Sequence, residues 1–306
     1  MAQKSSQRVG GIPVQLSHLD KVFFPDDGIT KGDLVAYYQE MAPRIIGYLR
    51  DRPLVMERYP DGINGQRLVQ KNIPRYFPDW VTRAEVPKRD GVVSHVVADK
   101  PATLVYLANQ ACVELHVFLS ALAELDRPDQ LVFDLDPPDE AGFSLACRHA
   151  LNLRELLEGE LGLTTFVKTT GGKGLHVHVP LRPDRDFDTV RGFAREVATV
   201  LAGRFPRDLT VEQRKEQRGQ RLYLDLMRNA YAQTVVAPYA VRARPGAPVA
   251  TPLHWAEVED AGLHPRRFTM RTLPGELDRR GDPWAGMNSR RRRLPDDKRL
   301  AGIRSG

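Results

Sequence analysis

The stretch LVFDLDPPD, residues 131–139, places two aspartates in an apolar run that ends in two prolines. Side chains alternate between the two faces of a strand, so the apolar odd-numbered residues share one face, and Asp134 and Asp136 share the other. Two ionised carboxylates this close repel each other, and partial burial strengthens the repulsion. A divalent cation would relieve it, because carboxylate oxygens are hard ligands. The alternative is a half-exposed strand whose acids are simply solvated.

A second strand carries a third acid. RLYLDLMRN, residues 221–229, also alternates and leaves Asp225 as a lone carboxylate on an otherwise apolar strand. Three carboxylates on neighbouring strands could hold two metal ions about 3.5–4 Å apart, as polymerases and nucleases do. One ion would activate an attacking hydroxyl, and the other would neutralise charge on a leaving pyrophosphate.

A glycine-rich turn joins two further strands in KTTGGKGLHVH, residues 168–178. Backbone amides of the turn, the hydroxyl of Thr170, the ammonium of Lys173 and the imidazole of His176 could together cradle a triphosphate. Two alternatives remain open. The glycines could serve only a tight hairpin, and His176 with His178 could bind a transition metal.

Basic residues surround the third acid in the sequence. Arg218 and Arg228 flank Asp225, and Arg242 follows in VAPYAVRAR. Arginines near carboxylates are often structural ion-pair partners, but beside a triphosphate they would bind phosphate oxygens in a bidentate manner. His116, in VELHV, is not singled out by composition, because a lone histidine on an apolar segment is most often a core residue.

Composition is typical of a globular protein: 306 residues, 42% hydrophobic, 27% charged and a net charge of +6. No apolar run is long enough for a membrane span, and the N-terminus lacks the apolar core of a secretory signal. The two cysteines, Cys112 and Cys147, fit buried thiols in a reducing cytoplasm, and without a CxxC pair a zinc ribbon is excluded. The modest basic excess is weak support for a polyanionic partner.

The order of elements predicts an α+β fold with two lobes around a cleft, because hairpin-length turns join too many strands for a regular βαβ alternation. Neither a GxGxxG nor a P-loop pattern is present. Residues 1–11 are expected to form a flexible arm, residues 12–285 the catalytic domain, and residues 286–306 a basic tail. The four arginines in that tail are either solvated or contact nucleic acid. Helical spacing predicts a helix from Lys31 that breaks near Pro43.

Four blocks together resemble the polymerase domain of bacterial ligase D, the non-homologous end-joining branch of the archaeo-eukaryotic primase superfamily. They are LVFDLDPP, TTGGKGLHVHVPL, YLDLMRN and APYAVRAR, in the family's order. The resemblance runs from about Val14 to about Pro283 and implies a primase-like fold with mixed and antiparallel sheets flanked by helices. Motifs of an adenylating ligase or a phosphoesterase are not recognisable.

The resemblance also assigns roles to individual residues. The metal-binding and catalytic positions would be Asp134, Asp136 and Asp225. The nucleotide-binding positions would be His116, Thr170, Lys173, His176, Arg218, Arg228 and Arg242. The DNA-binding positions would be Lys21 and Lys31, at a 5′-phosphate, and Arg58 and Lys71, along the template.

Two positions depart from the family pattern. Leu68 and Val69 stand where family members can carry two phenylalanines that stack on the template, and aliphatic side chains offer no stacking face. Glu57 stands where a basic residue is common before Arg58. Both changes bear on template geometry and end bridging, and neither touches the carboxylates.

The expected function is therefore a template-dependent primase-polymerase that adds nucleotides to a primer 3′-hydroxyl at DNA gaps or breaks. Ribonucleotide preference, two Mn²⁺ or Mg²⁺ ions, 5′-phosphorylated DNA, a separate ligase, a Ku-like partner and a cytoplasmic, nucleoid-associated location are implied by the resemblance. A metal-dependent nuclease or phosphodiesterase using the same carboxylates is one alternative. A non-catalytic protein that binds DNA ends is the other.

Overall fold

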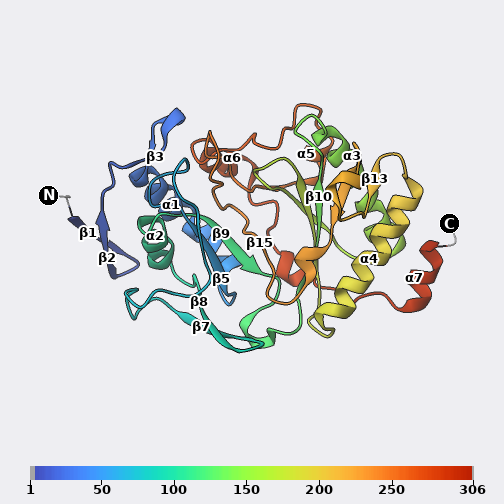
Figure 1. Ribbon diagram of the computed structural model, residues 1–306, viewed down its shortest axis with the longest axis horizontal. Coiled ribbons are helices and arrows are strands. Elements are labelled where there is room, and N and C mark those ends of the chain that lie inside the picture. Colours follow the sequence, from blue (N-terminus) through green and yellow to red (C-terminus); the bar gives the residue numbers. More distant parts are fainter. Residues whose placement is uncertain (1–3, 305–306) are drawn as a thin grey trace. The chain divides into compact units, whose positions relative to one another are not determined.

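The computed structural model describes residues 4–304 and divides into two compact units, each assembled from three separate stretches of the chain. Unit 1 contains Met1–Ala123, Thr234–Ala250 and Phe268–Gly281, and unit 2 contains Glu124–Gln233, Thr251–Arg267 and Asp282–Gly306. In Figure 1 the blue-to-teal part of the chain belongs to unit 1, and most of the green-to-yellow part belongs to unit 2. None of the helices among the described residues is both long and apolar enough to cross a membrane.

Unit 1 begins with two hairpins and a long helix. Strands β1 (Lys4–Val9) and β2 (Ile12–Ser17) pair antiparallel, as do β3 (Val22–Phe24) and β4 (Ile29–Thr30). Residues 4–9 are therefore a paired strand and not the predicted flexible arm, whereas residues 1–3 lie outside the described part. The β1–β2 hairpin forms because Gly10 and Gly11, both with positive φ, allow a tight turn between the strands.

Helix α1 (Lys31–Leu49) is longer than the sequence predicted. It starts with a capping box, in which the Thr30 hydroxyl accepts from the Asp33 amide and the Asp33 carboxylate accepts from the Thr30 amide. The helix continues through Pro43, so the predicted break there is wrong. Burial of one apolar face, including Leu34, outweighs the lost backbone hydrogen bond.

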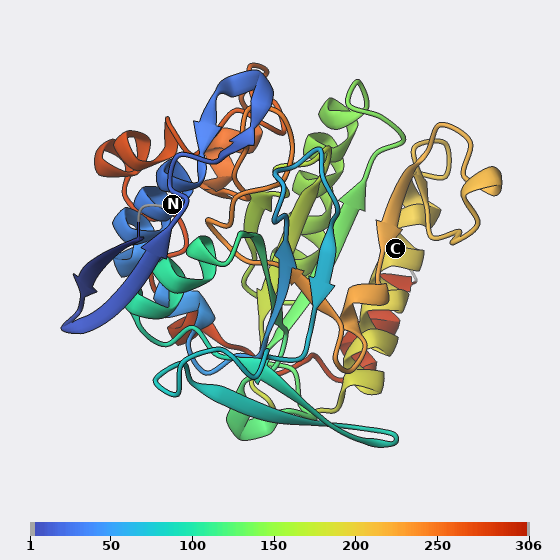
Figure 2. The same cartoon turned by 60° about the vertical axis from the view of Figure 1, so that its left-hand side comes forward.

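The main sheet of unit 1 has the order β15-β9-β5-β8-β7, with β6 paired to β5. The strands are β5 (Leu54–Arg58), β6 (Leu68–Gln70), β7 (Arg83–Lys88), β8 (Gly91–Val96), β9 (Cys112–Phe118) and β15 (Thr234–Val236). Helices α2 (Pro101–Asn109) and α6 (Leu273–Arg280) and the 3₁₀ turns η1 (Pro25–Asp27) and η2 (Leu122–Glu124) complete the unit, although η2 runs one residue past its end. Figure 2 shows the β5–β6 hairpin in lighter blue and the long β7–β8 hairpin in teal.

Unit 2 is built on a second sheet with the order β13-β14-β10-β12-β11-β16. The strands are β10 (Gln130–Asp136), β11 (Phe166–Thr169), β12 (Leu175–Pro180), β13 (Leu209–Thr210), β14 (Leu222–Asp225) and β16 (Pro252–Leu253). All pairs are antiparallel except β13 with β14. Leu131, Phe133 and Leu135 of β10 have no exposed surface, as their alternation predicts, and burial of each contributes roughly 1.5–3 kcal/mol.

Helices pack against this sheet. They are α3 (Phe143–Arg154), followed directly by the π-helix η3 (Glu155–Glu160), and α4 (Phe187–Arg204). The remaining elements are α5 (Trp255–Val258), α7 (Asp297–Arg304), η4 (Lys215–Gln217), η5 (Met227–Asn229) and η6 (Met287–Arg290). The α+β fold with antiparallel sheets and flanking helices is confirmed. The two cysteines are free and buried.

The arginine run near the C-terminus is attached to unit 2. Arg291 Nη2 lies 2.6 Å from Oδ2 of Asp129, which is only 2% exposed. Residue Arg292 forms a parallel bridge with Leu181, and Arg293 Nε lies 3.2 Å from Asp184 Oδ2. This segment is therefore part of the folded unit. Residues 305 and 306 belong to the predicted tail and lie outside the described part.

Candidate active site

Strand pairing in unit 2 brings the three predicted carboxylates to one face of the sheet. Asp134 of β10 lies directly opposite Asp225 of β14, and Asp136 lies opposite Tyr223. Directly opposed residues share a face, and Asp136 follows Asp134 by two positions, so all three aspartates lie on the same side. The side chain of Asp134 is 14% exposed and that of Asp136 is 34% exposed. β10 is an interior strand of the sheet, and burial of its apolar face holds the aspartates in place.

The electrostatics of Asp225 show the crowding of negative charge. Burial raises the pKa of the Asp225 carboxyl, and the charges of Asp134 and Asp136 raise it further. A hydrogen bond from the Met227 amide to Oδ1, at 2.8 Å, acts in the opposite direction but does not cancel the increase. A cluster of carboxylates that repel one another in a partly buried place favours a cation, so this oxygen donor set fits Mg²⁺ or Mn²⁺.

Two cations lie beside Asp136. Lys173 Nζ is 3.1 Å from Oδ1, and Arg218 Nη1 is 4.0 Å from Oδ2. Lys173 also donates to the carbonyl of Pro137 at 2.6 Å, which fixes the ammonium over the end of β10. The Arg218 guanidinium stacks on the ring of Tyr223 at 3.6 Å from its centroid. Both cations are therefore held in place at the carboxylates by contacts other than the ion pairs.

Two further basic side chains lie beside Asp134. His176, directly opposite it on β12, has Nε2 at 3.5 Å from Oδ1. Arg228, in η5, has Nε at 3.8 Å from Oδ2 and is 45% exposed. An acidic cluster ringed by four basic groups can bind divalent cations together with a polyphosphate, because the carboxylates take the metal and the cations take the phosphate oxygens.

The glycine turn between β11 and β12 lies against the strand that carries the aspartates. The Thr170 hydroxyl accepts from the Gly172 amide at 3.2 Å and donates to the Gly174 carbonyl at 3.1 Å, so Thr170 organises the turn. A Cβ atom at Gly174 would lie 2.2 Å from the carbonyl oxygen of Leu135, which no side chain could tolerate. The turn can approach β10 only because residue 174 is glycine.

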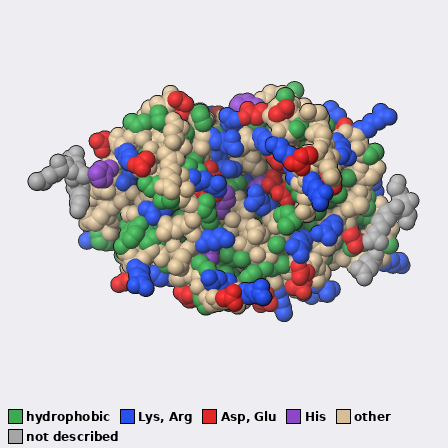
Figure 3. All heavy atoms as spheres, in the orientation of Figure 1, with side chains coloured by type: hydrophobic (Ala, Val, Ile, Leu, Met, Phe, Trp, Pro, Cys, Tyr) green, Lys and Arg blue, Asp and Glu red, His purple; other side chains and the backbone are tan. Residues whose placement is uncertain are grey.

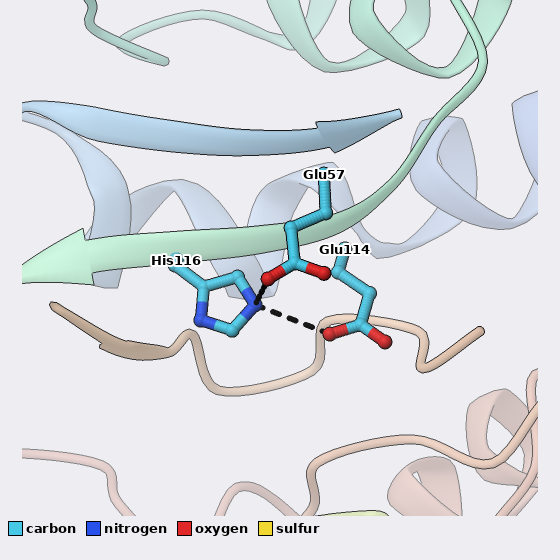
Figure 4. Close-up of side chains that lie close together, drawn as sticks. All are labelled: Glu57, Glu114 and His116. Atoms are coloured by element: carbon cyan, nitrogen blue, oxygen red, sulfur yellow. Dashed lines mark hydrogen bonds and ion pairs between the residues drawn. The ribbon is translucent and has the colours of Figure 1, made fainter. Parts of the chain in front are cut away.

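A second cluster, which sequence reasoning missed, lies in unit 1 (Figure 4). Glu57 of β5 lies opposite Glu114 of β9, and His116 follows Glu114 by two positions on the same face. The His116 Nε2 atom is 3.3 Å from Glu57 Oε1 and 3.1 Å from Glu114 Oε2. The spacing of Glu114 and His116 in VELHV could have indicated that these two side chains share a face of a strand. The position of Glu57 depends on the register of β5 against β9.

In this cluster one possible ligand atom from each of the three residues lies within 4.8 Å of the other two. Among the described residues no other three acidic, histidine or cysteine side chains, the three aspartates included, lie this close. The cluster could hold a cation, but both carboxylates already have guanidinium partners. Arg67 binds Glu57 through two bonds of 2.6 Å, and Arg242 Nε lies 2.9 Å from Glu114. A metal ion here would compete with two arginines at 2.6 and 2.9 Å, whereas the two arginines beside the aspartates, Arg218 and Arg228, lie farther away, at 4.0 and 3.8 Å.

Charge pairing dominates the chemistry of Glu114. Burial alone would raise the pKa of this carboxyl, but the hydrogen bond with His116 and the charge of Arg242 lower it to about 2. The predicted nucleotide-binding residues His116 and Arg242 are thus joined through one carboxylate. Both belong to unit 1, whereas Thr170, Lys173, His176, Arg218 and Arg228 gather around the aspartates of unit 2.

The two lysines predicted to bind a 5′-phosphate occupy neighbouring positions in unit 1. Lys31 is only 6% exposed, and its Nζ donates to the carbonyl of Ser17. Burial, and then the charge of Lys21, lower the pKa of Lys31 to about 8. Lys21 pairs with Asp61 at 2.7 Å and is 41% exposed. A buried ammonium destabilised by a neighbouring ammonium is suited to an anionic ligand.

The two residues predicted along the template path differ in their surroundings. Lys71 is exposed. Arg58 is half-buried and is used inside the unit, because Nε donates to the Gln110 carbonyl and Nη1 donates to Gln70 and Tyr76, at 2.8 and 2.9 Å. On the face drawn in Figure 3, Lys and Arg side chains stand in several separate groups among acidic and hydrophobic ones.

The fold matches that of a solved polymerase domain. The polymerase domain of Mycobacterium tuberculosis ligase D, solved in complex with DNA, matches with a TM-score of 0.84 and 30% sequence identity, over 91% of this chain and 99% of that one. The fold is therefore the archaeo-eukaryotic primase-like fold. The family model described as "LigD, primase-polymerase domain" matches residues 30–284. The chain belongs to this family.

Curated relatives agree with this assignment. The bifunctional non-homologous end joining protein LigD of Bacillus subtilis is 33% identical over 95% of this chain. The multifunctional LigD proteins of Mycobacterium tuberculosis and Pseudomonas aeruginosa are each 32% identical, over 97% and 96% of it. The chain spans between 35% and 46% of the length of these three relatives.

Proposed function

We propose that this protein is a nucleotidyltransferase that adds nucleotides to a primer 3′-hydroxyl at DNA gaps or breaks, within end-joining repair. The observation that carries the proposal is the alignment of Asp134, Asp136 and Asp225 on one face of a sheet, ringed by basic groups. Family membership and the end-joining names of the relatives support it.

The aspartates would hold two Mn²⁺ or Mg²⁺ ions. Such ions, when bound, supply Lewis acidity at the 3′-hydroxyl and neutralise charge on the leaving pyrophosphate. The protein contributes position and charge. Lys173 and Arg218, beside Asp136, and Arg228, beside Asp134, would bind triphosphate oxygens, and the amides of the turn organised by Thr170 would cradle them. Most of the rate enhancement would come from such positioning and electrostatic stabilisation.

On unit 1, His116 would approach the sugar of the incoming nucleotide, and a preference for ribonucleotides rests on this role, which the family resemblance supplies. Lys21 and Lys31 would bind the recessed 5′-phosphate of a gap. Burial, and then the charge of Lys21, lower the pKa of Lys31, and this supports the assignment because a phosphate would favour the charged form. Charge-based contacts to DNA should weaken as salt increases. A ligase and a Ku-like protein are the expected partners, and the nucleoid is the expected location.

Primer extension on gapped and blunt DNA tests the proposal. The assay compares NTPs with dNTPs in Mn²⁺ and in Mg²⁺, using the wild type and Asp136→Ala. Asp188→Asn is a matched control, because Asp188 lies in the same unit but is 86% exposed on α4. We expect Asp136→Ala to lose extension and keep DNA binding, and the control to behave as the wild type.

Extension by Asp136→Ala at the wild-type rate would refute the assignment. The labelled primer also separates the alternatives, because a nuclease that uses these carboxylates would shorten it. A protein that only binds DNA ends would leave its length unchanged with every nucleotide and metal.

A further inference from the structure

An exposed aromatic residue of unit 1 is not used by the site described above. Tyr76 is 61% exposed, which makes it the most exposed of the large hydrophobic side chains among the described residues. Single exposed apolar residues are common on protein surfaces and need no explanation by themselves. Tyr76 differs because its hydroxyl is hydrogen-bonded and its ring packs against a second aromatic ring, while the residue is still 61% exposed.

The hydroxyl is fixed by the β5–β6 hairpin. The hydroxyl accepts a hydrogen bond of 2.9 Å from Arg58 Nη1. Arg58 Nη1 also donates to Gln70 Oε1, at 2.8 Å, and Gln70 lies in β6. Arg58 lies opposite Leu68 in the strand pairing, so Leu68 and Gln70 share its face of the hairpin. The tip of the Tyr76 ring therefore lies beside a strand that exposes an aliphatic side chain, because Leu68 is 36% exposed.

The ring is also held by an aromatic cluster. Tyr76 and Phe77 make an edge-to-face contact with centroids 5.3 Å apart, and Phe77 packs against Tyr106 of α2 at 5.0 Å. Trp80 contacts the same Tyr106 ring at 5.6 Å. Phe77 and Tyr106 are buried, at 2% and 7% exposed. An exposed ring that is held at two points loses little conformational entropy when a flat ligand covers it.

The surrounding charge selects the ligand. Between Leu68 and Tyr76 the chain has two cations, Lys71 and Arg75, and no acid, whereas Arg67 is paired with Glu57. Lys71 and Arg75 are exposed. Aromatic rings interleaved with cations are how proteins bind single-stranded nucleic acids, because bases stack on the rings and phosphates meet the cations. A protein partner with an acidic surface would use the cations but has no need of an open aromatic face.

We propose that Tyr76 is a stacking platform for an unpaired DNA base, with Leu68 completing the apolar surface and Lys71 and Arg75 contacting the adjoining phosphates. The proposal names a strand-contacting residue for the DNA partner of the proposed function, and it rests on that function for the choice of DNA. It also gives Arg58 a positioning role, because its hydrogen bond orients the Tyr76 ring towards the DNA strand.

The test uses a primer–template with a short unpaired template segment that carries 2-aminopurine, whose fluorescence falls when it stacks. Binding is measured by anisotropy with this DNA and with a blunt duplex. The variants are Tyr76→Ala, Tyr76→Leu, which keeps apolar bulk, and Tyr76→Phe, which keeps the ring. Tyr231→Ala is the matched control, because Tyr231 is also exposed, at 39%, and belongs to unit 2.

We expect Tyr76→Ala and Tyr76→Leu to bind the partly single-stranded DNA roughly 5- to 100-fold more weakly and to lose quenching. Tyr76→Phe should lose less affinity and less quenching than Tyr76→Ala, because the ring face remains although the hydrogen bond from Arg58 is gone. Binding to blunt duplex and the thermal unfolding midpoint should not change. Wild-type quenching by Tyr76→Ala, an equal loss by Tyr76→Phe, or an equal loss on blunt duplex would each overturn the proposal.

Nucleotide addition by the same samples separates this proposal from the function itself. If the wild type adds nucleotides and Tyr76→Ala binds and quenches normally, the platform is wrong and the function stands. If the wild type adds none but Tyr76 still governs binding to the unpaired segment, the function is wrong and the platform stands.

Discussion

Replacing Gly174 with alanine should damage the candidate active site through a steric effect on backbone atoms. The added Cβ would lie 2.2 Å from the carbonyl oxygen of Leu135, 3.2 Å from its carbonyl carbon and 3.3 Å from Cδ of Pro137. None of these atoms belongs to a flexible side-chain end, so no rotamer change can relieve the contact. The neighbouring strands β10 and β12 must separate.

The size of the effect follows from this geometry. Ordinary contact between such atoms begins near 3.4 Å, so the backbones must move apart by about 1 Å. Overpacking of this kind costs about 3 kcal/mol, the upper end of its usual range, because backbone atoms must shift. The same movement displaces Lys173 from Asp136, and a misplacement of about 1 Å can lower a rate about 100-fold.

The assay combines urea denaturation with primer extension on a gapped DNA. Gly192→Ala is the control, because Gly192 lies inside α4 with nothing within 4 Å of its added Cβ, and alanine should stabilise that helix by roughly 0.5–1 kcal/mol. We expect Gly174→Ala to lose both stability and activity, and the control to lose neither. A Gly174→Ala protein as stable and active as the wild type would show that the turn does not depend on this contact.

Four further predictions concern unit 1. Because the pKa of Lys31 is lowered to about 8, its charge is lost as pH rises above that value, and a bound phosphate would favour the charged form. Preference for a 5′-phosphorylated gap should therefore fall above pH 8, by up to about tenfold per pH unit in a competitive binding titration. Lys21→Ala with Lys31→Ala should remove this preference, and a double variant that retains it would contradict the phosphate site. Glu114→Gln should cost about 3–5 kcal/mol in chemical denaturation, since His116 and Arg242 lose a buried partner. Glu114 has its pKa lowered from 4.5 to about 2, so the stability that it contributes should be present above pH 4.5 and lost as pH falls towards 2, and a wild type without this loss would count against the ion-pair network.

Local sequence pattern predicted four strands of the unit 2 sheet, β10, β11, β12 and β14, but not the short strands β13 and β16. The alternation in LVFDLDPP predicted which side of β10 is buried, and the glycines in KTTGGKGLHVH predicted the turn before β12. The opposition of Asp134 and Asp225 agrees with the prediction that their strands are neighbours. These features depend on side-chain alternation within a strand and on turn chemistry, both of which can be read from short segments.

Other features depend on partners far away in the chain and could not be read in this way. The cluster of Glu57, Glu114 and His116 requires the register of β5 against β9, which local sequence patterns do not specify. The burial of Lys31 was hidden because lysines are almost always exposed. The hydrogen bonds of Arg58 to Gln70, Tyr76 and the Gln110 carbonyl likewise depend on residues far away in the chain, and its place along the template path stays a prediction.

The assembly of each unit from three stretches has a consequence for synthesis on the ribosome. Translation is vectorial, and domains made of one continuous segment can fold as they emerge. Here β15, the partner of β9, is made only at residues 234–236, after the first stretch of unit 2, Glu124–Gln233, and α6 follows at residues 273–280. The nascent chain must therefore keep an incomplete sheet edge at β9 exposed until residue 236 has been made, and this edge is where a co-translational chaperone would be needed.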